Sequence, residues 1–143
     1  METEVRRLFD RYERSFNEAL RGHVDLKEAT SFYAPAFISA TPLGVAAGAN
    51  DDGLKRALEQ GYAHYRATGT KQMRVTGIRT TPVDEGHCIA HVAWTATYAR
   101  RDKADVSIDF EVHYLIQKLG QEPTIFGWIA GDEQALLRKH GIA

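Results

Sequence analysis

Apolar side chains recur at steps of three and four residues in the first half of the chain. This spacing predicts an amphipathic helix over about residues 4–21. A second helix covers about residues 25–33, with Asp25 as its cap, and stops before Pro35 because the residue preceding a proline disfavours helical backbone. A third, with Asn50 or Asp51 as its cap, runs to about residue 67 and presents an apolar stripe, as the first does. Both stripes are therefore expected to pack against a common surface.

The second half of the chain changes to a period of two, which is typical of half-buried strands. Strands are predicted over residues 71–81, 89–98, 106–118 and 124–130, and an earlier strand over residues 37–41. The glycine-rich residues that follow the earlier strand are predicted to form a loop, and Asp132 can cap a last helix. The order predicts an α+β fold, with three N-terminal helices packed on one strongly curved, mostly antiparallel sheet and a short C-terminal helix.

Alternation divides the two longest strands into an apolar and a polar face. A three-residue turn at 101–103 pairs Trp94 with Phe110 and Thr95 with Asp109, which keeps apolar opposite apolar. The apolar face is rich in aromatic residues, and the first helix adds more: Trp94, Tyr98, Phe110, Tyr114, Phe126 and Trp128 from the sheet, with Phe9, Tyr12 and Phe16 from the helix. Two interpretations stay open. The aromatic residues form a filled core, or they leave a pocket with a few polar groups.

Composition narrows the class of protein. The chain has 143 residues, a formal net charge of −1 and one cysteine, Cys88. This excludes an intramolecular disulfide and a multi-cysteine zinc site, and it argues against nonspecific nucleic-acid binding. The uncharged run 29–50 is long enough for a membrane span, but Pro35 and Pro42 interrupt it. We expect a cytoplasmic protein, a single domain over residues 1–143, without a membrane segment.

The layout of helices and strands resembles the nuclear transport factor 2-like superfamily. The C-terminal segment of this chain is similar to the closing segment of polyketide cyclase-like (SnoaL-like) members. It reads Trp128-Ile-Ala-Gly-Asp132, followed by Ala135-Leu-Leu137 and Gly141-Ile142. In those cyclases an aspartate near this place is an acid/base in ring closure, and the resemblance gives that role to Asp132. A helix cap is the other interpretation of this residue.

A second branch of the superfamily, ketosteroid isomerase, is similar at Arg11-Tyr12, where its members place a tyrosine that binds an oxyanion. The resemblance thus implies a hydrogen-bond donor at Tyr12. At the position of the isomerase base, however, the chain reads Thr41-Pro42 and has no carboxylate. The chain therefore lacks the carboxylate base that ketosteroid isomerase uses to remove a proton beside a carbonyl group.

These observations predict a protein that binds a small apolar molecule, without a cofactor. The expected contact residues are Phe9, Phe16, Trp94, Phe110, Tyr114, Phe126 and Trp128, with Asp132 and Tyr12 as the catalytic pair if the protein is an acid/base isomerase or cyclase. The alternative is a non-catalytic ligand-binding or dimeric interaction module. A transport adaptor has only the fold in its favour.

The polar face of the sheet suggests a partner rather than a metal. His91 and His113 are expected to lie opposite each other with Glu111 near, but two well-placed ligands do not make a metal site, so none is predicted. In the superfamily this outer face often forms a twofold dimer. The resemblance therefore implies a homodimer through the outer sheet face.

Overall fold

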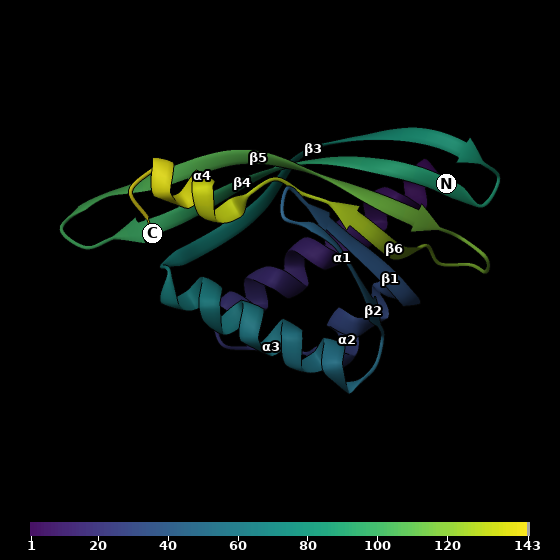
Figure 1. Ribbon diagram of the computed structural model, residues 1–143, viewed down its shortest axis with the longest axis horizontal. Coiled ribbons are helices and arrows are strands. Elements are labelled where there is room, and N and C mark those ends of the chain that lie inside the picture. The colour runs from purple at the N-terminus through teal and green to yellow at the C-terminus, as the bar shows by residue number, and fades with distance from the viewer. Residues whose placement is uncertain (143) are drawn as a thin grey trace.

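The computed structural model describes residues 1–142. Its elements follow in chain order as α1 Glu2–Leu20, α2 Leu26–Ser31, β1 Tyr33–Thr41, β2 Gly44–Ala49, α3 Asp52–Ala67, β3 Thr70–Asp84, β4 His87–Arg100, β5 Lys103–Gln117, β6 Thr124–Ile129 and α4 Glu133–Lys139. The predicted α+β class is confirmed, with helices first, then a curved sheet and a short last helix (Figure 1).

The predicted caps are present at the helix starts. The side chain of Asp25 accepts a hydrogen bond from the backbone N–H of Glu28 (3.0 Å), and Asp132 accepts one from Ala135 (3.0 Å). Asp51 accepts one from Gly53 (2.8 Å). Each cap satisfies an N–H that has no partner within its helix. Local sequence thus sets where these three helices begin.

The six strands form one sheet in the order β2-β1-β6-β5-β4-β3. Only β1 and β6, among the described strands, run parallel; all other neighbours are antiparallel. Trp94 lies opposite Phe110 and Thr95 opposite Asp109, as the hairpin length predicts. Helices α1, α2 and α3 lie on one side of this sheet (Figure 1). We call this side the inner face and the opposite side the outer face.

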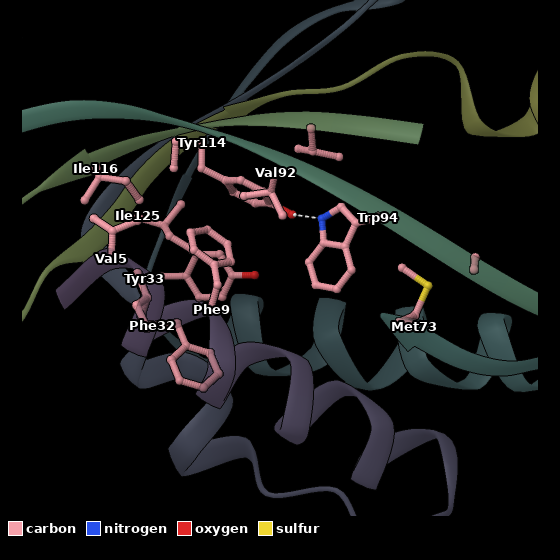
Figure 2. Packing of buried hydrophobic residues seen from close by; sticks show 14 of the residues in the cluster. Val5, Phe9, Phe32, Tyr33, Met73, Val92, Trp94, Tyr114, Ile116 and Ile125 are labelled. Atoms are coloured by element: carbon pink, nitrogen blue, oxygen red, sulfur yellow. Dashed lines mark hydrogen bonds between the residues drawn. The ribbon is translucent and has the colours of Figure 1, made fainter. Parts of the chain in front are cut away.

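The core lies between α1 and the inner face. Along β4 every second residue from Cys88 to Tyr98 is buried, and the residues between them are half-buried. Phe9 of α1 packs on Tyr114 with ring centroids 4.8 Å apart, and Trp94 lies beside this pair (Figure 2). The inner face is therefore aromatic, as the alternation predicts.

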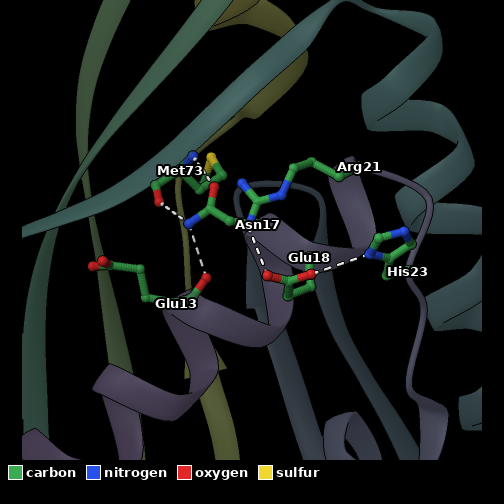
Figure 3. A network of polar contacts seen from close by, with 6 residues as sticks. All are labelled: Glu13, Asn17, Glu18, Arg21, His23 and Met73. Atoms are coloured by element: carbon green, nitrogen blue, oxygen red, sulfur yellow. Dashed lines mark hydrogen bonds and ion pairs between the residues drawn. The ribbon is translucent and has the colours of Figure 1, made fainter.

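Polar groups fix α1 along the free edge of β3. The amide of Asn17 donates to the backbone oxygen of Met73 (2.7 Å) and accepts from its N–H (2.9 Å), as Figure 3 shows. The Glu13 carboxylate accepts from the N–H of Val75 (2.7 Å). An edge strand presents unpaired backbone groups, and these two side chains satisfy some of them. They also hold α1 against the strand that carries Met73.

Two boundary predictions are wrong. Residues 44–49 form a strand, β2, where a loop is predicted, and β1 begins at Tyr33 where the second helix is predicted to end. Strand β2 lies at the sheet edge and nearly all of its small side chains are exposed, so it has no hydrophobic alternation to detect. The turn before it depends on Gly44, whose φ of 131° favours glycine.

The predicted phase of Phe126 is also wrong. The pairing of β5 with β6 shifts by one residue, so that Ile116 lies opposite Ile125 while Tyr114 lies opposite Trp128. Ile125 and Trp128 thus share the inner face although they are three residues apart. This bulge turns Phe126 to the outer face, where its ring contacts His87 at a centroid distance of 6.0 Å.

None of the helices within residues 1–142 has the length and apolar character needed to cross a membrane.

Candidate functional site

A cavity of about 390 Å³ lies between the inner face of the sheet and helices α1 and α3. Aromatic side chains dominate its wall: Tyr12, Phe16, Tyr33, Tyr62, Tyr65, Trp94, Phe110, Tyr114 and Trp128. The aromatic residues do not fill the space between helices and sheet. A cavity of this volume falls in the range that small-ligand sites occupy.

Ring contacts between helices α1 and α3, and between strands β1 and β6, build the wall of the cavity. Helix α3 places Tyr62 and Tyr65 on one side, and both rings meet Phe16 of α1 edge-on, at centroid distances of 5.5 and 5.2 Å. On the sheet side, Trp128 stacks on Phe37 of β1 at 5.4 Å. These ring contacts pack the wall side chains against one another and leave the cavity open.

The floor of the cavity carries three phenols and an indole. The Trp94 Nε1–H donates to the hydroxyl of Tyr114 (3.2 Å), which leaves the proton of that hydroxyl to donate elsewhere (Figure 2). The hydroxyls of Tyr12 and Tyr33 lie 3.4 Å apart. Tyr12 belongs to α1, Tyr33 to β1 and Tyr114 to β5 in the middle of the sheet.

Burial keeps these phenols protonated. It raises the pKa of Tyr12 above its ordinary value and raises those of Tyr33 and Tyr114 well above theirs, since a buried phenolate would lose its hydration. The neighbouring phenols add to the rise for Tyr33 and Tyr114. At neutral pH the phenols are therefore neutral, and an O–H whose proton is not used between Tyr12 and Tyr33 can donate to a carbonyl or hydroxyl oxygen.

The mouth of the cavity is charged where α4 begins. The Tyr65 hydroxyl donates to the Glu133 carboxylate, at 3.1 Å to Oε2 and 3.3 Å to Oε1. Burial and the Glu133 charge raise the pKa of Tyr65, and burial raises that of Tyr62 to about 12. Of the described residues that line the cavity, only Asp132 and Glu133 carry carboxylates. Thr41 also lines the wall, and its side chain is not acidic.

Asp132 has the geometry of a helix cap at the rim. Its Oδ1 accepts the N–H of Ala135, and the residue is exposed. It also borders a second hollow of about 310 Å³, lined by Leu136, Leu137 and Ile108 among others. The carboxylate thus lies where a ligand would enter, not in the aromatic floor.

Most of the predicted site residues meet at this cavity. Tyr12, Phe16, Trp94, Phe110, Tyr114, Trp128 and Asp132 line it. Phe9 does not; it is buried beneath Tyr12 and Tyr114 as core. Phe126 does not either, because of the bulge in β6.

Four aromatic or acidic residues of the wall and mouth are missing from the predicted site: Tyr33, Tyr62, Tyr65 and Glu133. The inner stripe of the third helix contains Tyr62 and Tyr65, so its periodicity could have identified them. Tyr33 is predicted to lie at the end of a helix, and no local signal in the sequence indicates that Glu133 lies at the mouth.

The fold is shared by many solved structures. An NTF2-like protein with a cystatin-like fold from Novosphingobium aromaticivorans superposes with a TM-score of 0.69 at 12% identity, covering 99% of this chain and 87% of that one. A ketosteroid isomerase-like protein from Erwinia carotovora gives 0.62 at 13% identity, covering 90% and 93%. A putative scytalone dehydratase from Novosphingobium aromaticivorans gives 0.63 at 11%, covering 90% and 80%. Likeness at such low identity shows the fold alone.

The comparison with curated proteins finds no match. A family model does match: the family described as "NTF2-like protein (DUF6841)" covers residues 2–133, almost the whole chain. This confirms the resemblance to the nuclear transport factor 2-like superfamily, while the likeness of the tail to SnoaL-like members stays a prediction. The chain belongs to this NTF2-like family.

Proposed function

We propose that the protein binds a small, mainly apolar molecule that carries a carbonyl or hydroxyl oxygen. The observation that carries this proposal is the open, aromatic cavity with neutral phenol donors from Tyr12, Tyr33 and Tyr114 on its floor. The apolar wall supplies affinity by removing ligand surface from water, and a donor on the floor orients the oxygen. The charged groups stay at the mouth, in contact with water.

Calorimetric titration with a matched pair of probes tests the proposal. 2-Tetralone and tetralin share a ring system, and only 2-tetralone carries an acceptor oxygen. We expect 2-tetralone to bind about three- to tenfold more tightly, the gain of one net hydrogen bond. The preference is expected to fall in Tyr12→Phe or Tyr114→Phe. Equal binding of both probes would contradict the role of the phenols.

A variant that fills the cavity provides the control for location. Gly61 of α3 lines the cavity, and a Cβ added there meets no atom within 4 Å. Gly61→Leu is expected to abolish binding of both probes, while Gly61→Ala keeps it. Binding that survives in a folded Gly61→Leu protein would place the probes elsewhere.

A second candidate function is acid/base turnover at the mouth. It is favoured by the two carboxylates there and by the Tyr65 hydroxyl, which holds one of them in place. Two structural neighbours are described as ketosteroid isomerase-like and as a putative scytalone dehydratase. In this proposal Asp132 removes or returns a proton, and Tyr12 donates a hydrogen bond to the developing oxyanion.

Exchange of the α-hydrogens of 2-tetralone in D2O, followed by NMR, measures such proton transfer directly. If Asp132 is the base, Asp132→Asn abolishes the protein-dependent exchange while the amide oxygen still caps α4. Glu133→Gln is the matched variant for the neighbouring carboxylate. If 2-tetralone binds but the protein does not speed its exchange, acid/base turnover is refuted. The proposal of ligand binding then stands alone.

The part of the outer face formed by β2, β1 and β6 supports a homodimer as the assembly. Exposed apolar side chains of β1, β2 and β6, namely Ile38, Val45 and Ile129, stand on this face, which carries none of α1–α3. A second copy would cover them. Light scattering at micromolar concentration is expected to give twice the chain mass. Val45→Glu should lower it, and Leu119→Glu in the exposed β5–β6 turn is the control; a monomeric mass for the unaltered protein would refute the dimer.

A further inference from the structure

Three side chains with metal-ligating atoms converge on the outer face, away from the cavity. His91 of β4 and His113 of β5 lie directly opposite each other, with their Nδ1 atoms 2.7 Å apart. Glu111 Oε1 lies 3.6 Å from His113 Nδ1. One ligand atom from each of these three residues lies within 4.8 Å of the other two. None of the three residues lines the cavity or belongs to the hydrophobic core.

Strand geometry explains why these three residues meet. Partners in an antiparallel ladder project to the same side, and residues two apart on one strand do so as well. The β4–β5 register therefore places His91 beside His113, and Glu111 follows because it precedes His113 by two positions. Their outer-face position also leaves them accessible, with 37% of the His113 side chain and 44% of Glu111 exposed.

A neighbour on β3 orients one of the two rings. The Thr81 hydroxyl lies 2.8 Å from Nε2 of His91. When Nε2–H donates to that oxygen, the lone pair of the ring is at Nδ1 and points toward His113. A partner of this kind on the second nitrogen is the usual support of a histidine that binds a metal.

We propose that His91, His113 and Glu111 bind a divalent transition-metal ion, Zn²⁺ by the chemistry of the donors, with the remaining position open to solvent. Two imidazole nitrogens and one carboxylate oxygen are a ligand set that zinc accepts, and three protein ligands leave one position of a tetrahedron for water. The site is new with respect to the cavity, and it does not depend on the proposed ligand or turnover.

The rearrangement that binding requires is small. Zinc–nitrogen bonds of about 2.0–2.1 Å in a tetrahedron put the two nitrogens about 3.3 Å apart. The two Nδ1 atoms must therefore separate by about 0.6 Å from their 2.7 Å contact, a change that rotation of two half-exposed rings supplies. The ion then takes the place of the hydrogen bond between the rings.

The positive charge of Arg79 opposes binding of the ion. Arg79 Nη2 lies 3.7 Å from Glu111 Oε1, so its guanidinium competes for the carboxylate and repels a cation. Removing this charge should strengthen the site. A gain of affinity on substitution is a sharp test, because general damage to the sheet would not produce it.

The experiment is a calorimetric titration of Zn²⁺ into protein that carries no histidine tag and has been freed of metal by chelator. We expect one ion per chain, and at least about a tenfold loss of affinity in each of His91→Asn, His113→Asn and Glu111→Gln. His64→Asn, a histidine of α3 outside the cluster, is the matched control and should bind as the unaltered protein does. Circular dichroism verifies that every variant is folded.

Arg79→Gln completes the design and should raise the affinity severalfold. Co²⁺ added to the same proteins gives an independent reading, because tetrahedral nitrogen–oxygen coordination produces strong visible absorption that the His91→Asn variant should lack. The proposal is overturned if Zn²⁺ does not saturate the unaltered protein near one equivalent. It is equally overturned if His91→Asn and His113→Asn bind the ion as tightly as His64→Asn.

Discussion

Strands β4 and β5 carry two opposite surfaces, one on each side of the same backbone. On the inner face Trp94 and Tyr114 are buried and hydrogen-bonded to each other. Burial raises the pKa of the Tyr114 phenol, which keeps it neutral. On the outer face His91 and His113 are half-buried, and their partners are other titratable or hydroxylic side chains. The inner face is thus suited to neutral, apolar molecules, and the outer face to ions or to a second protein surface.

The comparison teaches that alternation assigns residues to faces, while the covering of each face decides what the residues can do. The inner face has α1 and α3 above it, so its polar groups must find partners among themselves. The outer face keeps contact with water, where imidazole and carboxylate groups exchange partners at little cost. A substitution should therefore have a different consequence on each side of one strand.

The largest expected difference separates two neighbours on β5. Ile116 points inward and is 0% exposed, whereas Leu115 points outward and is half-buried. Ile116→Ala should lower the free energy of unfolding by about 2–5 kcal/mol, and Leu115→Ala by about 1 kcal/mol. Urea unfolding followed by tryptophan fluorescence measures both.

The same pair tests whether the outer face is covered. If a second copy packs on it, Leu115→Ala will cost more, and its cost will grow with protein concentration. Equal losses for the two variants at nanomolar concentration, where a weak dimer has dissociated, would refute the contrast between the faces.

Gly127 of β6 offers the next effect in size. A Cβ there would come within 2.9 Å of Ile38 Cγ1 and 2.9 Å of Leu115 Cδ1. Gly127→Ala should therefore destabilise by about 1–3 kcal/mol through overpacking. Shortening the neighbour should relieve it, so the Leu115→Ala/Gly127→Ala double variant is expected to lose less than the sum of the two single losses. Strict additivity would show that the crowding is not at Leu115.

The register that defines both faces could be predicted from sequence, because the tight turn between β4 and β5 allows one pairing that keeps apolar residues together. That single deduction placed Trp94, Phe110 and Tyr114 at the inner face and His91 opposite His113. The caps at Asp25, Asp51 and Asp132 were predictable because an aspartate at a helix start acts through its nearest N–H groups.

The features that could not be predicted depend on tertiary contacts, which the sequence alone does not define. The bulge that turns Phe126 outward follows from the pairing of β6 with both β5 and β1. No residue type at that position predicts a bulge. Strand β2 lacks alternation because its side chains are small and exposed. Alternation predicts the correct face for Glu111, the third residue of the proposed metal site. That its carboxylate lies 3.6 Å from His113 depends on the side-chain conformation, which the sequence does not define.

Asp132 marks where the contrast between the faces weakens. It borders the inner cavity, yet it is exposed like an outer-face residue and caps α4. Asp132→Ala should cost about 0.5–2 kcal/mol of stability, and Asp132→Asn close to none, because the amide oxygen still accepts the N–H of Ala135. Thermal unfolding distinguishes them. Similar losses in both variants would assign the charge, rather than the cap, the larger part of the stabilisation.

The smallest effect has the opposite sign and tests the cavity itself. Gly61→Ala is the same chemical change as Gly127→Ala, but a Cβ at Gly61 meets no atom within 4 Å because the cavity lies in front of it. Only the helix propensity of α3 then counts, and alanine should stabilise the protein by about 0.5–1 kcal/mol. A rise in the unfolding midpoint with unchanged 2-tetralone binding is the expected result. Destabilisation would mean that the wall closes over Gly61 in solution, so that one methyl group already overfills a space that the proposed ligand would need.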